Sequence, residues 1–453
     1  MSPILGFAGG PLVVGGPNFG IPGQPFTWDP AKMPIQYRVD PGPMAVNPSG
    51  TTVIDNATGL QRVQSMFGVW QSVSTAAISY SNVGTILPVG SYVQGADLNT
   101  LTQYNDVVGS CQKGIQNPVV FDADGQLMSN LGLSASVIGF ASPCALDPSS
   151  GHIVGALLVM NGKFQNGVNT SSDRELSANG FDEAITHEIG HFSGLDHSQM
   201  NVDLLTNPSS PCDVDKLAGL PLMFPIELCQ ARKDAGLPVL SPDDVSVISS
   251  LYPNQSFVSN YGTITGTIYF SDGVSQAQGI NVIARAIDDP ATGQDESRRI
   301  AVSAVSGYLF TGNPGQSITA NMPDSQENNT GGDKTGSRDP KFIGFYKIAV
   351  PPGIYTVEVE GINSQFVSGS SVGPLDPPVA LPGGVPKFWN KNSSAFDFPQ
   401  QRDTIQVNPG DQIQGIDIIL NSTPPQFDQY EDSGALFGVP APSSDAECEE
   451  RRA

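Results

Sequence analysis

The chain has 453 residues, more than one hydrophobic core usually organises, so two domains are expected. Its formal net charge is −23, from 21 Lys and Arg against 44 Asp and Glu. Because phosphate binding needs clustered Lys and Arg, this composition argues against nucleic acid and anionic membranes as partners. No stretch approaches the roughly 18 apolar residues of a transmembrane segment. The many acidic residues are compatible with bound Ca²⁺, although acidity that only keeps a secreted protein soluble explains them equally well.

The chain begins with a leader, followed by a strand and a helix. Residues 1–25 are rich in Gly and Pro, so we expect an extended leader that packs loosely, if at all. Apolar and polar residues alternate over 33–40 and predict a strand, while 57–73 has apolar residues at helical spacing and predicts a core helix. The residues expected to face the core are Ile35, Tyr37, Val39, Leu60, Val63, Phe67 and Trp70.

A short acidic stretch follows the next predicted strand. Residues 119–121 have strand character, and the sequence Asp-Ala-Asp-Gly comes directly after them. The carboxylates of Asp122 and Asp124 could hold Ca²⁺, but the Glu that completes a calcium loop is missing. Since Asp and Gly are also typical turn residues, a plain turn is the alternative interpretation.

Three of the four histidines lie in one short stretch that reads HExxHxxGxxH. His187 and His191 are four residues apart, so on a helix their imidazoles lie on one face and can share a metal ion. Glu188 lies about 100° around the helix from His187, where it can reach a water on the metal rather than the metal itself. Gly194 permits the left-handed conformation that ends a helix, so the chain can turn and bring His197 back as a third ligand.

This set of residues predicts a catalytic zinc site. Three neutral imidazoles with one open position are typical of catalytic zinc, whereas structural zinc usually has four protein ligands rich in Cys. Zinc lowers the pKa of its bound water to about 7, and Glu188 would take the proton as general base. The motif HExxH alone also occurs by chance, so the added Gly194 and His197 carry much of the argument.

The pattern from His187 to His197 resembles that of the metzincin metallopeptidases, and Ser198 after the third His is similar to the matrixin branch. The resemblance implies an α+β fold over residues 26–255, with a twisted mixed sheet, the zinc helix and a C-terminal helix. It also implies a Met-turn, whose methionine forms an apolar floor under the metal, and Met223 is the candidate.

Two further stretches bear on this resemblance. Residues 241–252 look like the C-terminal helix of matrixins, with Ser241 as N-cap and Pro at the first helical position. The 26 positions from His197 to Met223 are more than we expect for vertebrate-type matrixins, so an insertion is expected over 199–220. The cysteine-switch motif of the propeptide is missing, so any latency must be arranged differently or the chain is already mature.

The resemblance also assigns a substrate-binding strand. An apolar, β-branched run over 153–160 lies upstream of the zinc helix, and in metzincins the strand at this place is the sheet edge that adds the peptide substrate as an extra strand. We assign this role to Gly155, Ala156, Leu157, Leu158, Val159 and Met160. His152, at the start of the run, is interpreted as an exposed loop residue, and the zinc helix is expected to begin at Asn179 or Asp182.

None of the five cysteines has the spacing of a zinc ribbon or a CxxC motif. We pair Cys111 with Cys144 and Cys212 with Cys229 as a hypothesis, which leaves Cys448 unpaired. Disulfides would indicate an oxidising, extracellular setting. The first basic residue is Lys32, so no signal peptide is visible. Either a signal has been removed or export uses another route, and we favour the former.

After a polar linker at 253–261 the chain changes character. Over 262–421 short strands alternate with Gly and Pro turns, which predicts a β-sandwich and resembles the carboxypeptidase-regulatory, prealbumin-like modules of secreted bacterial enzymes. Residues 312–341 are rich in Asn, Gly and Ser and predict a long insertion, and 422–453 predict a disordered acidic tail.

Two functions fit these observations. The first is a secreted, bacterial-type zinc endopeptidase that cleaves a protein or peptide substrate through a zinc-bound water activated by Glu188. The alternative is a surface or matrix-binding protein, in which the β-sandwich binds a polysaccharide or protein and the zinc domain is a scaffold. The presence of Glu188 favours the peptidase, since a domain that had lost its peptidase activity would not need to keep the general base.

Overall fold

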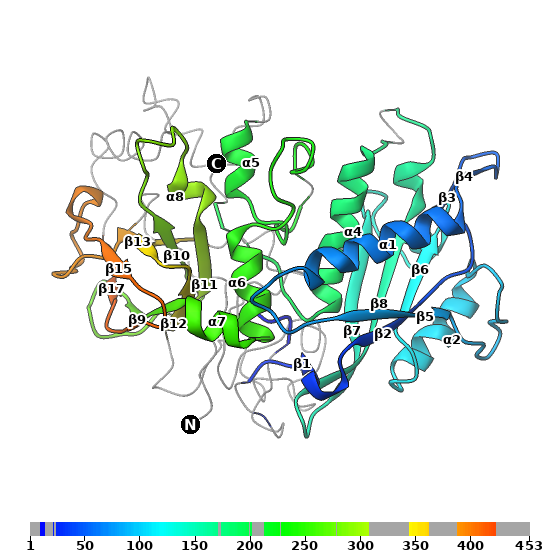
Figure 1. Ribbon diagram of the computed structural model, residues 1–453, viewed down its shortest axis with the longest axis horizontal. Coiled ribbons are helices and arrows are strands. Elements are labelled where there is room, and N and C mark those ends of the chain that lie inside the picture. Colours follow the sequence, from blue (N-terminus) through cyan, green and yellow to red (C-terminus); the bar gives the residue numbers. More distant parts are fainter. Residues whose placement is uncertain are drawn as a thin grey trace.

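The computed structural model describes residues 10–13, 21, 24–170, 174–198, 200–201, 213–226, 228–277, 279–307, 344–361 and 387–422. Helices and several sheets are both present, so the fold is mixed α+β (Figure 1). The predicted insertion at 312–341, the tail after 422, most of the stretch 199–220, Cys212 and Cys448 lie outside these residues. None of the helices in the described ranges has the length and apolar character needed to cross a membrane.

A six-stranded sheet forms the centre of the N-terminal half, residues 24–260. Its strands run in the order β1-β8-β6-β2-β5, and β7 pairs with the other side of β8. All neighbours are parallel except β7, which is antiparallel to β8. The strands are β1 (Thr27–Trp28), β2 (Ile35–Val39), β5 (Tyr80–Thr85), β6 (Pro118–Asp122), β7 (Gly139–Asp147) and β8 (His152–Asn161).

Helices cover this sheet, and Figure 1 shows α1 and α4 beside each other across it. The helices are α1 (Asn56–Gln71), α2 (Leu101–Cys111), α3 (Gln126–Asn130), α4 (Ala178–Phe192), α5 (Val214–Gly219), α6 (Pro242–Leu251) and α7 (Gln255–Asn260). A small hairpin pairs β3 (Ala45–Val46) with β4 (Thr52–Ile54), and single 3-10 turns occupy Pro30–Lys32 and Gly162–Gln165. The short α7 occupies the stretch predicted to be a polar linker, because Asn254 caps it and Phe257 is buried.

The predicted core positions of β2 and α1 are confirmed. Ile35, Tyr37 and Val39 alternate with more exposed residues along β2, as the period of a half-buried strand requires. Along α1, Val63, Phe67 and Trp70 are buried, and Leu60 is half-buried. The indole N–H of Trp70 also donates to the carbonyl of Thr186 at 2.7 Å, which joins α1 to α4.

The leader does not pack as loosely as its composition predicts. Gly10–Val13 lie beside the chain that follows α4: the N–H of Leu12 donates to Gly194 O at 2.8 Å. The N–H of Asp196 donates to Gly10 O at 3.0 Å. Leu12 and Val13 are buried in the main core. Burial of these apolar side chains and the backbone hydrogen bonds hold this segment in place, despite the Gly and Pro content of the leader.

The C-terminal half, residues 262–421, contains two sheets. One has the order β11-β10-β13-β14, with β15 also on β13, and the other has the order β12-β9-β16, with β17 also on β9. The elements are β9 (Gly262–Tyr269), β10 (Asn281–Ala286), α8 (Glu296–Arg299), β11 (Ala301–Val305), β12 (Phe345–Val350), β13 (Gly353–Glu360), β14 (Lys387–Phe388), β15 (Ile405–Val407), β16 (Gln412–Ile413) and β17 (Ile418–Ile419). Both sheets contribute to one buried apolar cluster: Ile264, Ile268, Ile348 and Val350 from one, and Val282, Ala284, Val357 and Val359 from the other.

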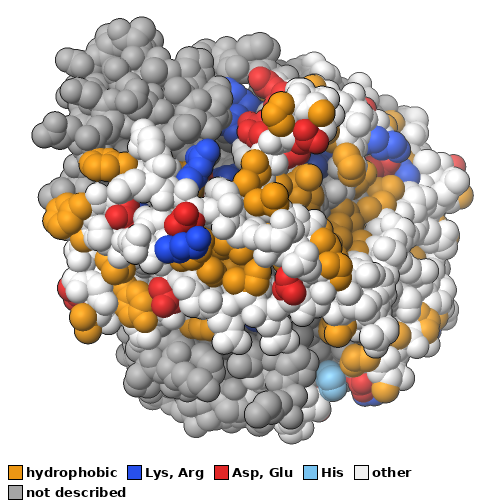
Figure 2. Space-filling model, turned by 60° about the vertical axis from the view of Figure 1, so that its left-hand side comes forward, with side chains coloured by type: hydrophobic (Ala, Val, Ile, Leu, Met, Phe, Trp, Pro, Cys, Tyr) orange, Lys and Arg blue, Asp and Glu red, His pale blue; other side chains and the backbone are white. Residues whose placement is uncertain are grey.

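Figure 2 brings the C-terminal half forward and shows mixed surface chemistry. On the described part of this face, acidic and basic side chains are interspersed, and hydrophobic side chains lie among polar ones. Exposed apolar residues of the C-terminal half include Val274 and Phe396, which are 78% and 69% exposed.

Candidate metal centre

Helix α4 carries two of the three histidines and begins earlier than predicted. Its N-cap is Ser177, whose side chain accepts from the N–H of Gly180. Asn179 and Asp182, the predicted caps, lie inside the helix, and their side chains bond instead to Asp234 and to Arg62. The apolar face of α4 is fully buried: Phe181, Ile185, Ile189 and Phe192.

The end of α4 is satisfied by residues that are distant in sequence. Gly194 has the predicted left-handed conformation, with φ of 95°. The carbonyl of Phe192 accepts from the indole of Trp28 at 2.9 Å, and that of Ser193 accepts from the hydroxyl of Tyr252 at 2.5 Å. Helix-terminal carbonyls lack partners within their own helix, so these two side chains fix where the chain leaves α4.

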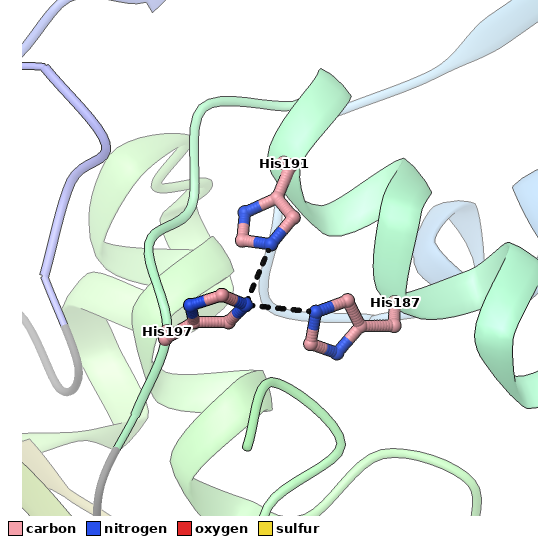
Figure 3. Close-up of side chains that lie close together, drawn as sticks. All are labelled: His187, His191 and His197. Atoms are coloured by element: carbon pink, nitrogen blue, oxygen red, sulfur yellow. Dashed lines mark hydrogen bonds between the residues drawn. The ribbon is translucent and has the colours of Figure 1, made fainter. Parts of the chain in front are cut away.

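The three histidines of the motif converge on one point (Figure 3). The Nε2 atom of His197 is 3.1 Å from that of His187 and 3.0 Å from that of His191. Among the described residues, they are the one group of three or more potential ligands close enough to hold a metal ion. The structure therefore brings together all three predicted ligands.

Two of the rings are oriented by backbone carbonyls. His187 Nδ1 is 2.7 Å from Leu222 O, and His191 Nδ1 is 2.8 Å from Leu195 O. A carbonyl only accepts, so in both rings Nδ1 carries the proton and Nε2 is left as a ligand atom. Nδ1 of His197 is buried and has no hydrogen-bond partner in the described part of the chain.

The surroundings keep the imidazoles neutral. Burial lowers the pKa of His187, and it lowers that of His191 to about 3, assisted by the neighbouring His187. Burial also lowers the pKa of His197 well below its ordinary value, and the other two rings add to the effect. A metal ligand must be the neutral form, so desolvation and mutual repulsion prepare this cluster for a cation.

Met223, the candidate for the Met-turn, lies against α4. A Cβ built on Gly190 would come within 2.3 Å of the Met223 sulfur, so the helix and the methionine are in direct contact. The carbonyl of Met223 accepts from the N–H of Ser198, next to His197, at 2.9 Å. Met223 thus contacts both α4 and the loop that carries His197.

The turn around Met223 is fixed by Asp244. Its carboxylate accepts from the N–H groups of Leu222 at 2.8 Å and Met223 at 3.0 Å. The same carboxylate completes a capping box with Ser241 at the start of α6. The prediction of Ser241 as N-cap is confirmed, and Asp244 additionally holds the turn, which the capping pattern alone does not indicate.

Glu188 lies between α4 and the antiparallel strand β7. Its Cγ would be 3.0 Å from a Cβ built on Gly139, so the strand approaches it closely. Burial raises the pKa of Glu188 to about 8, which the backbone N–H of Ala141 opposes by hydrogen bonding. Its Oε2 is buried and has no hydrogen-bond partner among the described residues. A cation held by the histidines would favour the carboxylate form.

The predicted substrate-binding edge is wrong. Residues 155–160 belong to β8, which is an inner strand: Leu158 is opposite Ala141 of β7 on one side and Val119 of β6 on the other. The edge of the sheet is β7, which has no strand on its other side among the described residues. The resemblance alone assigned the edge to this run, whereas its continuous apolar character is typical of an inner strand.

The other sequence predictions have different outcomes. Asp122 accepts from the N–H groups of Leu127 and Met128 at the start of α3, which is the turn alternative and leaves no support for calcium there. Cys111 is bonded to Cys144, and this joins α2 to β7. Cys229 is also disulfide-bonded, while its predicted partner lies outside the described residues. His152 is half-buried at the start of β8, near Thr27 O.

Comparison of the sequence with models of known protein families and with curated proteins finds no match. The residues that sequence reasoning missed are Trp28, Asp244 and Tyr252, which contact the end of α4 or the turn at Met223. Capping signals around 241–244 were the one trace of them in the sequence.

Proposed function

We propose that the protein is a secreted zinc endopeptidase of the metzincin type, similar to matrixins. The observation that carries the proposal is the convergence of three neutral imidazole nitrogens beside a buried Glu188, with Nε2 of His197 lying 3.1 Å from that of His187 and 3.0 Å from that of His191. Three nitrogens each about 2.0–2.1 Å from a tetrahedral zinc would be roughly 3.3 Å apart, so the residues fit this ion. Three protein ligands leave one coordination position open, as in catalytic sites.

The residues of the chain divide the chemistry between them. A bound zinc ion would polarise the scissile carbonyl and acidify a water at the site. Glu188 accepts a proton from the attacking water at its unpaired Oε2 and passes it to the leaving amine. Leu222 O and Leu195 O hold two of the rings in the tautomer that directs Nε2 to the ion.

The substrate is proposed to lie along β7 rather than β8. An extended peptide can add to a sheet only where a strand has a free edge, and β7 meets this requirement within the described residues. β7 also passes Glu188 near Gly139 and Ala141, so a peptide on this edge would be close to the base. The disulfide from Cys144 to α2 anchors the same strand.

The C-terminal half is proposed to be a β-sandwich, because its two sheets share one apolar core. The Cys111–Cys144 bridge supports an oxidising, extracellular location. Nothing in the described surface favours the alternative of a matrix-binding protein over the peptidase. The convergence at the histidines instead gives the N-terminal half a chemical role.

Glu188→Gln tests the proposal. The variant should retain one zinc per chain and lose cleavage of denatured casein by about 10²–10⁴-fold, because the general base is removed while the ligands remain. Asp182→Asn, an equally conservative change on the same helix, is the control and should cleave at the wild-type rate. Wild-type cleavage should also stop when a chelator is added. Undiminished casein cleavage by Glu188→Gln would refute the mechanism.

A further inference from the structure

The loop that carries His197 continues onto the C-terminal half. Met200, three residues after the ligand, is 1% exposed and forms a separate apolar cluster with Ile283 of β10 and Ala301 of β11. A buried methionine makes many dispersion contacts, so this cluster fixes the loop on the C-terminal sheet. His197 is therefore followed, three residues later, by a side chain that is anchored in the C-terminal half.

A buried polar contact holds the same loop at Ser198, the residue directly after His197. The N–H of Ser303, on β11, donates to Asp243 Oδ1 at 2.7 Å, and its hydroxyl lies 3.2 Å from the same oxygen. The Ser303 hydroxyl is also 3.4 Å from that of Ser198, the residue next to His197. Ser198, Asp243 and Ser303 are each at most 2% exposed, so these bonds are shielded from solvent.

A third anchor holds Asn201. Its N–H donates to Glu360 Oε2, on β13, at 3.0 Å, while Oε1 of the same carboxylate accepts from Arg285 at 2.7 Å. Asn201 has φ of 63°, the left-handed region that non-glycine residues adopt only where their surroundings fix it. Glu360 and Arg285 supply such surroundings in the C-terminal half.

His197 depends on these anchors more than the other ligands do. The rings of His187 and His191 are oriented by carbonyls at Nδ1, whereas Nδ1 of His197 has no partner in the described part of the chain. The direction of its Nε2 must therefore follow from the position of its backbone. Groups that hydrogen-bond to a ligating ring typically contribute 10–100-fold to metal binding. For His197 the anchors of its backbone take the place of such a group.

We propose that the C-terminal half is a positioning part of the metal centre, in which Met200, Ser303 and Glu360 hold the loop so that His197 stays aligned with the two helix-borne ligands. The inference rests on the proposed function in taking zinc as the ion. It gives the C-terminal half a role in the site without requiring that it bind a ligand of its own. Figure 1 shows α6, which carries Asp243, between the two halves.

The test measures zinc affinity in the full chain by competition with a chromophoric chelator. Met200→Ala and Glu360→Ala should each weaken zinc binding by about tenfold or more, because each releases one anchor of the loop. Met200→Leu and Glu360→Gln should remain near wild type, since the first keeps the volume and the second keeps an acceptor for Asn201. Ile405→Ala is the matched control: Ile405 is buried in β15, on the side of the C-terminal half away from α4 (Figure 1).

The control separates positioning from general stability. Ile405→Ala should lower the melting temperature as much as Met200→Ala does, yet leave the zinc dissociation constant unchanged. Equal zinc affinity in folded Met200→Ala, Glu360→Ala and wild type would overturn the inference while leaving the peptidase proposal intact. A wild-type chain that binds no zinc would remove both. If Met200→Ala does not fold, Ser303→Ala carries the same test, with a several-fold weakening expected.

Discussion

His187 and His191 differ from His197 in what places them. The first two lie on one face of α4, so their spacing follows from the helix, and each ring has a backbone carbonyl at Nδ1. His197 lies in a loop whose shape depends on contacts with segments far away in the sequence. Local helix geometry therefore accounts for two ligands, and tertiary packing must account for the third.

The loop from Gly194 to Asn201 is held on both sides. Gly10 and Leu12 of the N-terminal segment bond to Asp196 and Gly194, before His197. The C-terminal half contacts Ser198, Met200 and Asn201, after it. Of the three histidines, His197 therefore lies in a segment that contacts both the N-terminal segment and the C-terminal half.

Gly190→Ala would test whether the positions of His187 and His191 are determined by helix α4 alone. Alanine gains about 1 kcal/mol over glycine in a helix, but here its Cβ would lie 2.3 Å from the Met223 sulfur and 3.2 Å from Trp70. Overpacking costs about 1–3 kcal/mol. We expect a net loss of up to about 2 kcal/mol and weaker zinc binding, measured by denaturant unfolding and chelator competition.

Gly68→Ala on α1 is the control for this change, because a Cβ at Gly68 would meet no atom within 4 Å. It should stabilise the protein by roughly 0.5–1 kcal/mol and leave zinc affinity unchanged. If Gly190→Ala stabilised the chain as much as Gly68→Ala does, the contact between Gly190 and Met223 would be unimportant and α4 would be independent of the turn.

Removal of residues 1–13 would test the N-terminal side of the loop. The truncation deletes the hydrogen bonds to Gly194 and Asp196. It also exposes to solvent the apolar surface against which Leu12 and Val13 pack. We expect a lower melting temperature and zinc binding weakened by about tenfold, as for the loss of other residues that orient a ligand. A chain lacking only residues 1–9 retains these bonds and should match wild type in both measurements. Identical zinc affinity in the two truncations would show that the N-terminal segment does not position His197.

The sequence was most informative where the determinants are local. The i, i+4 histidines, the left-handed Gly194 and the Ser241 cap all follow from helix geometry and appear as predicted. Sequence periodicity likewise identified the buried faces of β2 and α1. These features need no knowledge of what lies across the fold.

Features that depend on strand order or on distant partners were not predictable in the same way. An apolar run has the same pattern whether or not a neighbour covers its second edge, so β8 could not be recognised as an inner strand without β7. The burial of Leu12 and Val13 depends on the chain after α4, and the role of Asp244 depends on a turn 21 residues earlier. Such contacts join segments that no local pattern relates.

The smallest expected effect concerns the titration of Asp243. This titration reports on the contact between the two halves, because Asp243 of α6 bonds to Ser303 of β11. Burial raises its pKa to about 7, and the neighbouring Asp244 adds to this rise, while bonds from Ser198 and Ser303 oppose it. The folded state therefore binds a proton at Asp243 more tightly than the unfolded state, whose carboxyl has a pKa of about 3.9. Stability contributed by this group should be complete below pH 4 and fall as the pH rises towards 7.

Asp243→Asn should flatten that part of the pH dependence in the chelator-treated protein, measured as the free energy of unfolding between pH 4 and 7. Asn retains an oxygen that can accept from the N–H of Ser303, so the contact to β11 is kept while the titrating proton is removed. An unchanged slope in the variant would mean that Asp243 titrates alike in both states, and that the C-terminal half does not bury it in solution.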